Sequence, residues 1–134
     1  MFLGILSEEN KERFINLCGI AATADGMVVE AEKNMVFAYC REMNIKEHMP
    51  AATRSLDELL NEIKNGSSEQ ERRIIAFETL GLFSADDEYA PEEEELMEKI
   101  IDTLEIDKTS FAHTLSLLNV YKSVYKEICN HILL

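Results

Sequence analysis

Hydrophobic residues recur at intervals of three or four positions along most of the chain, which is the spacing of one face of an α-helix. The pattern predicts helices that begin near Ser7, Glu30, Ser55, Ser68, Pro91 and Asp107. Serine and aspartate suit the position just before a helix, and proline suits its first turn. No stretch alternates between apolar and polar residues for long enough to predict a β-strand. The sequence therefore predicts an all-α fold of six to seven helices.

Part of this pattern occurs twice, once in each half of the chain. The Ala24-Asp25 step aligns with Ala85-Asp86, and the same shift aligns Glu32 with Glu93. The apolar stripe that follows also aligns, with Met35, Val36, Tyr39, Cys40 and Met43 matching Leu96, Met97, Ile100, Ile101 and Leu104. Repetition of this kind is typical of a duplicated structural unit. We predict two copies of one helical hairpin, each made of a helix, an acidic corner and a second helix.

The hairpins are expected to share one domain over residues 1–134. The two copies would cover about residues 8–45 and 69–106, and a C-terminal helix would cover about residues 108–132. A chain of 134 residues is long enough to bury one core. Its apolar share of 46% and charged share of 29% are typical of a globular protein.

The predicted C-terminal helix carries apolar residues along its whole length. They are Phe111, Leu115, Leu118, Tyr121, Tyr125, Ile128 and Ile132. Tyr121 and Tyr125 lie one helical turn apart. We interpret them as residues that pack inside the fold, with an interface stripe as the alternative.

The net charge is −13, from 26 acidic and 13 basic side chains. Such a chain is repelled by phosphate backbones and by anionic lipid surfaces, so we expect no nucleic acid partner. Cations and basic protein surfaces are the partners that this charge favours. No apolar run approaches the length of a membrane-spanning helix. We therefore expect a protein partner and no membrane-spanning helix. The sequence is also compatible with a homo-oligomer.

Cys18, Cys40 and Cys129 are widely spaced, form no CxxC pair and lie in apolar-patterned runs. We interpret them as buried, reduced thiols, which indicates a reducing compartment, the cytoplasm. The histidines are also far apart, and the chain has no nucleophile elbow, phosphate loop or zincin motif. We therefore predict no catalytic residues, and a small helical enzyme is the least favoured class.

An acidic segment joins the two predicted helices of each hairpin, with the sequences ADGMVVEAE and ADDEYAPEE. The candidate metal ligands in these corners are Asp25, Glu32, Asp86, Asp87 and Glu93. Clustered carboxylates are the groups that Ca²⁺ and Mg²⁺ bind, so one interpretation is a site for such a cation shared between the two corners. The spacing is not that of an EF-hand, because apolar residues occupy places where that loop needs oxygen ligands.

The alternative is that these carboxylates are structural. If a helix begins at Pro91, then Glu93 occupies its third position and can accept a hydrogen bond from a free backbone N–H group. Negative charge near a helix N-terminus is also favoured, by about 0.3–1 kcal/mol. Asp25 and Asp86 can satisfy N–H groups of the corner in the same way. On this interpretation the corners bind no ion.

The motif in ADGMVVEAE, an Ala-Asp-Gly step followed by an aliphatic residue and then glutamate, resembles the signature of TerB-like domains. This family includes the tellurite resistance protein TerB and the N-terminal domain of the co-chaperone DjlA. The resemblance covers about residues 8–132 and implies an all-helical fold with two related hairpins. It also implies a role in tellurite resistance or a general stress response in bacteria.

The resemblance also implies that acidic residues bind divalent cations or partners. In this chain the matching residues are Asp25, Glu32, Asp86 and Glu93. The second copy departs from the family pattern, because Asp87 stands where the family has glycine. The chain has no His-Pro-Asp motif of a J-domain, so a chaperone-recruiting role is not carried over.

Together, these features predict a non-enzymatic, cytoplasmic TerB-like accessory domain in a bacterial stress response. It would bind a divalent cation, Ca²⁺ or Mg²⁺, a protein partner, or both, through its acidic corners. The alternative is a pure protein-interaction or oligomerisation module with no metal site.

Overall fold

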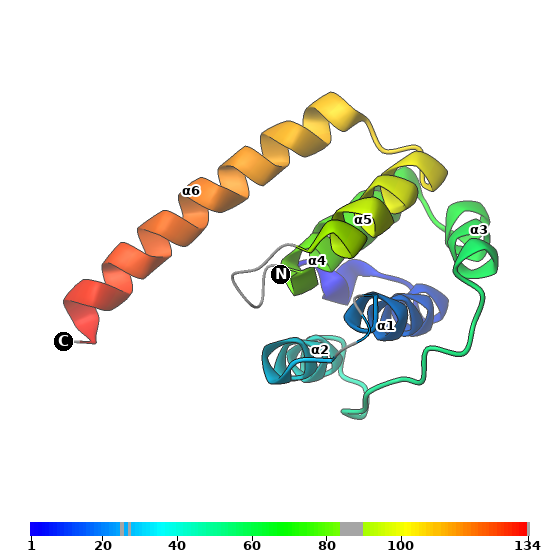
Figure 1. The fold of residues 1–134 in the computed structure, drawn as a ribbon, viewed down its shortest axis with the longest axis horizontal. Helices are drawn as coiled ribbons and strands as arrows, with labels where there is room; N and C mark the ends of the chain where they lie inside the picture. Colours follow the sequence, from blue (N-terminus) through cyan, green and yellow to red (C-terminus); the bar gives the residue numbers. More distant parts are fainter. Residues whose placement is uncertain (25, 27, 84–89, 134) are drawn as a thin grey trace.

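The protein is described by a computed structural model that covers residues 1–24, 26, 28–83 and 90–133. Within those ranges it contains six α-helices, one short 3₁₀-helix and no β-strand. The elements, shown in Figure 1, are η1 (Leu3–Ile5), α1 (Glu8–Ala22), α2 (Glu30–Glu42), α3 (Leu56–Gly66), α4 (Glu69–Phe83), α5 (Pro91–Thr103) and α6 (Lys108–Ile132). The predicted all-α fold is therefore confirmed.

Side-chain hydrogen bonds start α1 and α4 at the serines that the sequence indicated. Ser7 Oγ accepts a hydrogen bond from the N–H group of Asn10 at 3.2 Å. Ser68 and Glu71 form a reciprocal pair, because Ser68 Oγ accepts from the Glu71 N–H at 3.1 Å and Glu71 Oε1 accepts from the Ser68 N–H at 3.2 Å. These bonds satisfy N–H groups that the first turn of a helix leaves without a partner.

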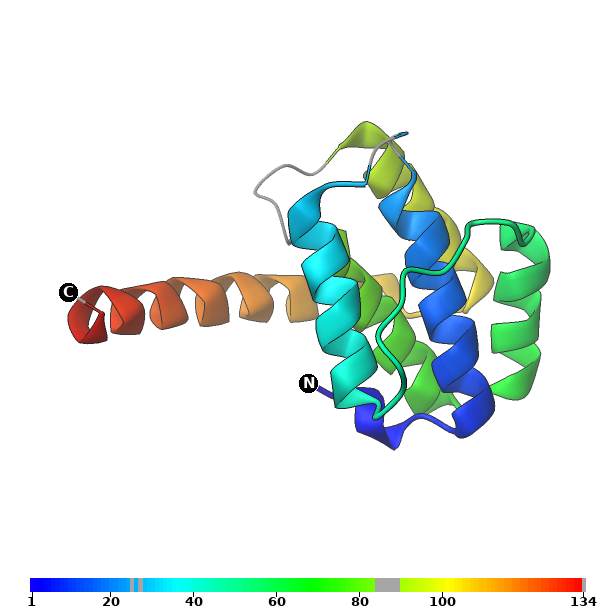
Figure 2. The ribbon, with the colours of Figure 1, turned by 90° about the horizontal axis from the view of Figure 1, so that it is seen from below.

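Helices α1 to α5 form one bundle around a shared apolar core. Helix α1 packs against α2, α3 and α4, and α4 packs in addition against α2 and α5. Figure 2 shows α2, α1 and α3 side by side on one face of this bundle. The largest fully buried side chains include Phe14, Leu17, Ile75, Leu82 and Phe83. Burial of each such side chain stabilises the fold by about 1.5–3 kcal/mol, so this core holds the bundle together.

Four helices keep the spacing of the sequence repeat at both of their ends. The shift that takes Glu32 to Glu93 also takes the first and last residues of α1 to those of α4, and the first and last residues of α2 to those of α5. The chain then leaves α2 and α5 in the same way, with positive φ angles of 57° at Asn44 and 56° at Glu105.

The hydrogen bonds at these two helix ends match as well. The N–H of Ile45 donates to the Cys40 carbonyl at 3.0 Å, and the N–H of Ile106 donates to the Ile101 carbonyl at 3.0 Å. Together with the positive φ angles, these bonds make both ends Schellman-type helix ends.

Helix α6 differs from the other helices because most of it projects away from the bundle. Figures 1 and 2 both show its C-terminal half extending beyond the other helices. Leu118 is the one residue of α6 that is buried. The rings of Tyr121 and Tyr125 stack on each other, with centroids 6.3 Å apart, but both side chains are exposed. The interpretation of these tyrosines as packing residues inside the fold is therefore wrong.

Candidate functional site

Two of the candidate ligands in the acidic corners, Glu32 and Glu93, are described by the structure, and both are buried at the first turn of a helix. Glu32 lies in the first turn of α2 and is 3% exposed, and Glu93 lies in the first turn of α5 and is 5% exposed. Glu93 Oε1 accepts a hydrogen bond from the N–H of Ala90 at 2.9 Å, so this carboxylate caps α5. Ala90 itself has no side-chain oxygen with which to cap the helix.

The other three candidate ligands, Asp25, Asp86 and Asp87, lie outside the described residues. Among the residues that the structure does describe, no three His, Cys, Asp or Glu side chains gather as a metal site would require. Of the five candidates, the structure therefore places Glu32 and Glu93, at equivalent helix starts.

A second set of carboxylates lies between η1, α2 and α4, and little in the sequence indicates it. Glu78 is 4% exposed, and its Oε1 accepts hydrogen bonds from the α-amino group of Met1 at 2.9 Å and from the N–H of Phe2 at 3.1 Å. Glu42 accepts from the same amino group at 3.1 Å and from the N–H of Leu3 at 2.8 Å. These bonds fix η1 against α2 and α4. The one indication in the sequence is that Glu78 interrupts an apolar stripe of the predicted helix.

The two carboxylates also set the charge state of the first residue. Partial burial lowers the pKa of the Met1 amino group, but the hydrogen bonds and charges of Glu78 and Glu42 outweigh that effect and raise the pKa. Nearby, the hydroxyl of Tyr39 donates to the Glu78 carbonyl at 2.7 Å. Burial of Tyr39, together with the charges around it, raises the pKa of its hydroxyl, which stays protonated.

A third polar cluster joins the starts of α1 and α4. Asn10 is fully buried, and its Nδ2 donates to Glu71 Oε2 at 2.9 Å and to the Gly66 carbonyl at 3.3 Å. Glu71 Oε2 also accepts from the N–H of Ser7 at 3.0 Å. Burial raises the pKa of the Glu71 carboxyl, but the hydrogen bonds from Asn10, Ser7 and Ser68 outweigh it and lower the pKa. This cluster is structural, because its donors and acceptors are paired within the fold.

The cysteines are spread over the bundle and α6. Cys18 and Cys40 are free and fully buried, in agreement with the prediction. Burial, with smaller contributions from Cys40 and Glu78, raises the pKa of the Cys18 thiol, which makes it a poor nucleophile. Cys129 lies on α6 and is partly exposed, so the prediction that it is buried is wrong. It fails because α6 leaves the core that was expected to cover it.

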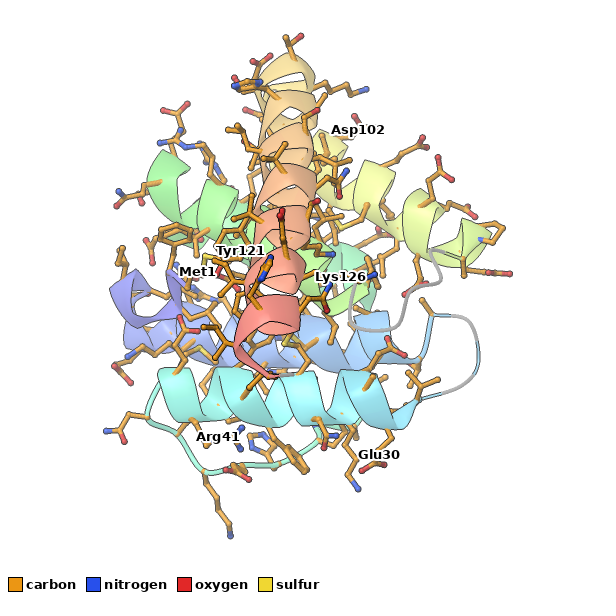
Figure 3. The ribbon with its side chains drawn as sticks, turned by 90° about the vertical axis from the view of Figure 1, so that its left-hand side faces the viewer. Met1, Glu30, Arg41, Asp102, Tyr121 and Lys126 are labelled. Carbon is orange, nitrogen blue, oxygen red and sulfur yellow. The ribbon has the colours of Figure 1, made fainter. Side chains whose placement is uncertain are left out.

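An apolar groove runs between the first half of α6 and the surface formed by η1 and α4. Its volume is about 640 Å³. Its apolar lining includes Phe2, Ile74, Phe77, Phe111, Leu118 and Tyr121. Figure 3 looks onto α6, with Tyr121 and Met1 on one side of the helix and Lys126 on the other. The rim carries charges of both signs, including Glu69 and Arg73, which pair with each other at 3.4 Å.

Beyond the groove, the apolar surface continues along α6 to its end. We call the large apolar residues of this helix that are more than half exposed the α6 face: Leu117, Val120, Tyr121, Val124, Tyr125, Ile128 and Ile132. Their exposed fractions run from 51% for Val124 to 74% for Ile132. Large apolar surfaces that stay open to water are characteristic of interaction sites. The sequence predicted that these residues share one helix. The spacing of apolar residues does not indicate which surface packs against them.

Comparisons with known proteins do not add to this description. No protein-family model matches the chain, and no curated protein or solved structure matches it either. The likeness to TerB-like domains therefore rests on the corner motif and on the internal repeat of the sequence. In the described part of the chain, no helix is both long enough and apolar enough to span a membrane.

Proposed function

We propose that this chain is a non-enzymatic binding module of TerB-like type, which acts in the bacterial cytoplasm by docking onto another protein surface. The observation that carries the proposal is the α6 face together with the groove at its base. An exposed apolar helix face with an adjoining cavity is the geometry by which amphipathic helices and helical bundles recognise proteins. The stress-response setting is supported by the resemblance of the corner motif.

The TerB-like assignment is supported by the duplicated hairpin. Helices α1 and α2 match α4 and α5 in length, in spacing and in the way that α2 and α5 end. The buried positions match as well, because Phe14, Leu17 and Cys18 correspond to Ile75, Glu78 and Thr79, and all six are buried. A duplicated hairpin is the arrangement that the resemblance implies.

The non-enzymatic character is supported by the bonds of four glutamates, of which Glu78 and Glu93 are buried. Glu78 and Glu42 bind the amino-terminal segment, Glu71 joins α1 to α4, and Glu93 caps α5. In each case the carboxylate is bound to groups of its own chain. These interactions hold the fold together and do not present a reactive group to a substrate.

Site-specific photo-crosslinking tests the proposal. A photo-reactive phenylalanine analogue is placed at Tyr125, on the α6 face, or at Ser123, on the polar side of the same helix, and the chain is irradiated in its host cell. Defined protein adducts at Tyr125 and none at Ser123 are expected. Equal labelling at both positions, or no adduct at either, would contradict a protein-docking role for this face.

A second candidate function is the binding of Ca²⁺ or Mg²⁺ at the acidic corners. The observation that favours it is the burial of Glu32 and Glu93 at equivalent helix starts, which draws negative charge into both corners. A cation would relieve the repulsion among these carboxylates. The ligand set would be completed by Asp25, Asp86 and Asp87.

Calorimetric titration of the metal-stripped protein with Ca²⁺ and Mg²⁺ tests this second candidate. Saturable binding that is lost in Asp25→Asn or Asp86→Asn supports a shared site. Weak heats that disappear at high salt, and that these substitutions leave unchanged, would assign the corners to helix capping.

A further inference from the structure

We infer that the α6 face is covered by a second copy of this chain, with α6 of each subunit packing into the groove of its partner to form a twofold dimer. The inference rests on the proposed docking role and names the partner. Four features carry it: the extent of the α6 face, the surface area of the chain, the distribution of charge, and the presence in each copy of both the groove and an arm, by which we mean α6.

The α6 face is too wide to be covered by the bundle of its own chain. Successive residues of an α-helix are rotated by about 100°, so Val124 points about 120° away from Leu118. Leu118 is the α6 residue that the bundle buries, whereas Val124 and Ile128 are more than half exposed. If α6 folded back onto its own bundle with Leu118 still buried, the side of the helix that carries Val124 would therefore stay exposed to water. A second surface is needed to bury it.

The surface area of the chain indicates the size of that second surface. The chain exposes 7950 Å². A compact monomer of 15.3 kDa exposes about 7,100 Å² by the usual scaling with mass. The excess is about 800 Å², which is roughly what each partner of a standard protein interface buries. Helix α6, which is about 37 Å long for its 25 residues, is the element whose projection adds surface in this way.

The distribution of charge also favours a second copy over other occupants. Residues 108–134 carry three lysines and one glutamate, a net charge of +2, whereas residues 1–107 carry a net charge of −15. Lys122 and Lys126 are exposed, and among the described residues neither forms an ion pair. A basic arm placed against the acidic bundle of another copy is attracted to it. The same acidic bundle opposes approach to an anionic membrane.

Each copy contains both surfaces that the contact requires. The groove offers aromatic and aliphatic side chains such as Phe2, Phe77 and Phe111, and the arm offers Val124 and Ile128. Because the exchange is reciprocal, a twofold axis relates the subunits and the assembly closes at two copies.

The test is the mass of the purified full chain by sedimentation equilibrium, from low micromolar to sub-millimolar concentration. The wild-type chain is expected at twice 15.3 kDa. The double variant Val124→Asp/Ile128→Asp is expected at the monomer mass, because two carboxylates on the α6 face cannot be buried unpaired. The matched control Ser123→Asp/Asn130→Asp carries the same added charge on the polar side of α6 and is expected to stay dimeric.

Circular dichroism accompanies each variant, so that loss of the dimer is separated from loss of folding. If the double variant unfolds, Tyr125→Asp replaces it, since this side chain is 58% exposed and, within the described residues, its ring contact is with Tyr121. A folded, monomeric face variant beside a dimeric control supports the inference.

Two results would overturn it: a monomeric wild-type chain at every concentration, or a dimer that survives the substitutions on the α6 face. The photo-crosslinking experiment then separates this failure from failure of the proposed function. Adducts of Tyr125 with a different protein would retain the docking role and reject the second copy. A monomer that binds vesicles containing anionic lipid through α6, with no protein adduct, would reject both.

Discussion

Glu78 shows how much one buried carboxylate contributes to this fold. It lies on the inner side of α4, where an unpaired charge would be costly, and it accepts hydrogen bonds from Met1 and Phe2. The first residues of the chain are thereby held against the bundle, and they form one wall of the groove. A buried polar residue thus positions part of the proposed docking surface.

We expect Glu78→Ala to lower the free energy of unfolding by about 1–3 kcal/mol, because the N–H of Phe2 loses its acceptor and a cavity remains. Urea denaturation measures this change. Glu47→Ala is the control, since Glu47 forms an exposed ion pair with Arg41 at 2.9 Å and such pairs contribute about 0–1 kcal/mol. Equal losses in the two variants would show that the buried hydrogen bonds of Glu78 contribute nothing specific.

The lowered pKa of Glu71 leads to a prediction of how the free energy of unfolding depends on pH. The pKa of its carboxyl is lowered from 4.5 in the folded state, so the folded chain holds this proton less tightly than the unfolded chain. The stability that Glu71 provides is therefore fully present when the pH is above the usual pKa of 4.5. It is lost as the pH falls through the lowered pKa of the folded state.

Glu71→Gln should destabilise the protein at neutral pH and reduce the loss of stability on acidification to about pH 3. Urea denaturation midpoints at the two pH values measure both effects. Glu69→Gln removes an exposed carboxylate from the same turn of α4 and serves as the control. An unchanged acid dependence in Glu71→Gln would reject the role assigned to its hydrogen bonds with Asn10, Ser7 and Ser68.

At the scale of elements, the ends of α2 and α5 offer a comparison between two equivalent positions. Asn44 and Glu105 both adopt positive φ, a region that asparagine tolerates better than glutamate and that glycine adopts without strain. Asn44→Ala is expected to lower the free energy of unfolding by about 1 kcal/mol.

Glu105→Gly is expected to raise the denaturation midpoint, because it removes the steric strain at that position. Glu105→Ala is the control, since it removes the ion pair with Lys64 and keeps the Cβ atom. A gain in Glu105→Ala as large as that in Glu105→Gly would show that charge, and not the φ angle, determines the effect.

The helices of the bundle were predictable because their signals are local. Serine caps at Ser7 and Ser68, the proline at Pro91 and the apolar period define where helices begin and which side is buried. The projection of α6 was not predictable in the same way. A stripe of apolar residues shows that a face avoids water, but whether its own bundle or another chain covers that face depends on how the helix leaves the bundle.

The candidate site was predictable only in part, for a similar reason. The glutamates of the acidic corners, Glu32 and Glu93, could be assigned to helix starts from spacing alone, and both lie there. The partners of Glu78 and Glu71 could not be found, because they belong to segments far away in sequence. Phe2 donates to Glu78 and Asn10 donates to Glu71, so each contact joins the start of the chain to α4.

At the scale of the whole molecule, the chain divides into an acidic bundle and a basic apolar arm. The bundle buries its core and satisfies its inner carboxylates with groups of its own. The arm leaves most of its apolar side chains in water, with Leu118 as its one buried residue. A helix that is held by so few contacts is expected to open locally more readily than the bundle does. A partner surface would suppress that opening.

Amide hydrogen exchange of the purified protein, followed over the projecting half of α6, tests this account most directly. If a second copy covers the α6 face, the amides between Val124 and Ile132 exchange slowly at high protein concentration, faster on dilution, and rapidly in Val124→Asp/Ile128→Asp at both concentrations. The Ser123→Asp/Asn130→Asp control follows the wild-type chain. Rapid exchange over this segment in the wild-type chain, at every concentration and unaltered by either pair of substitutions, would contradict the account.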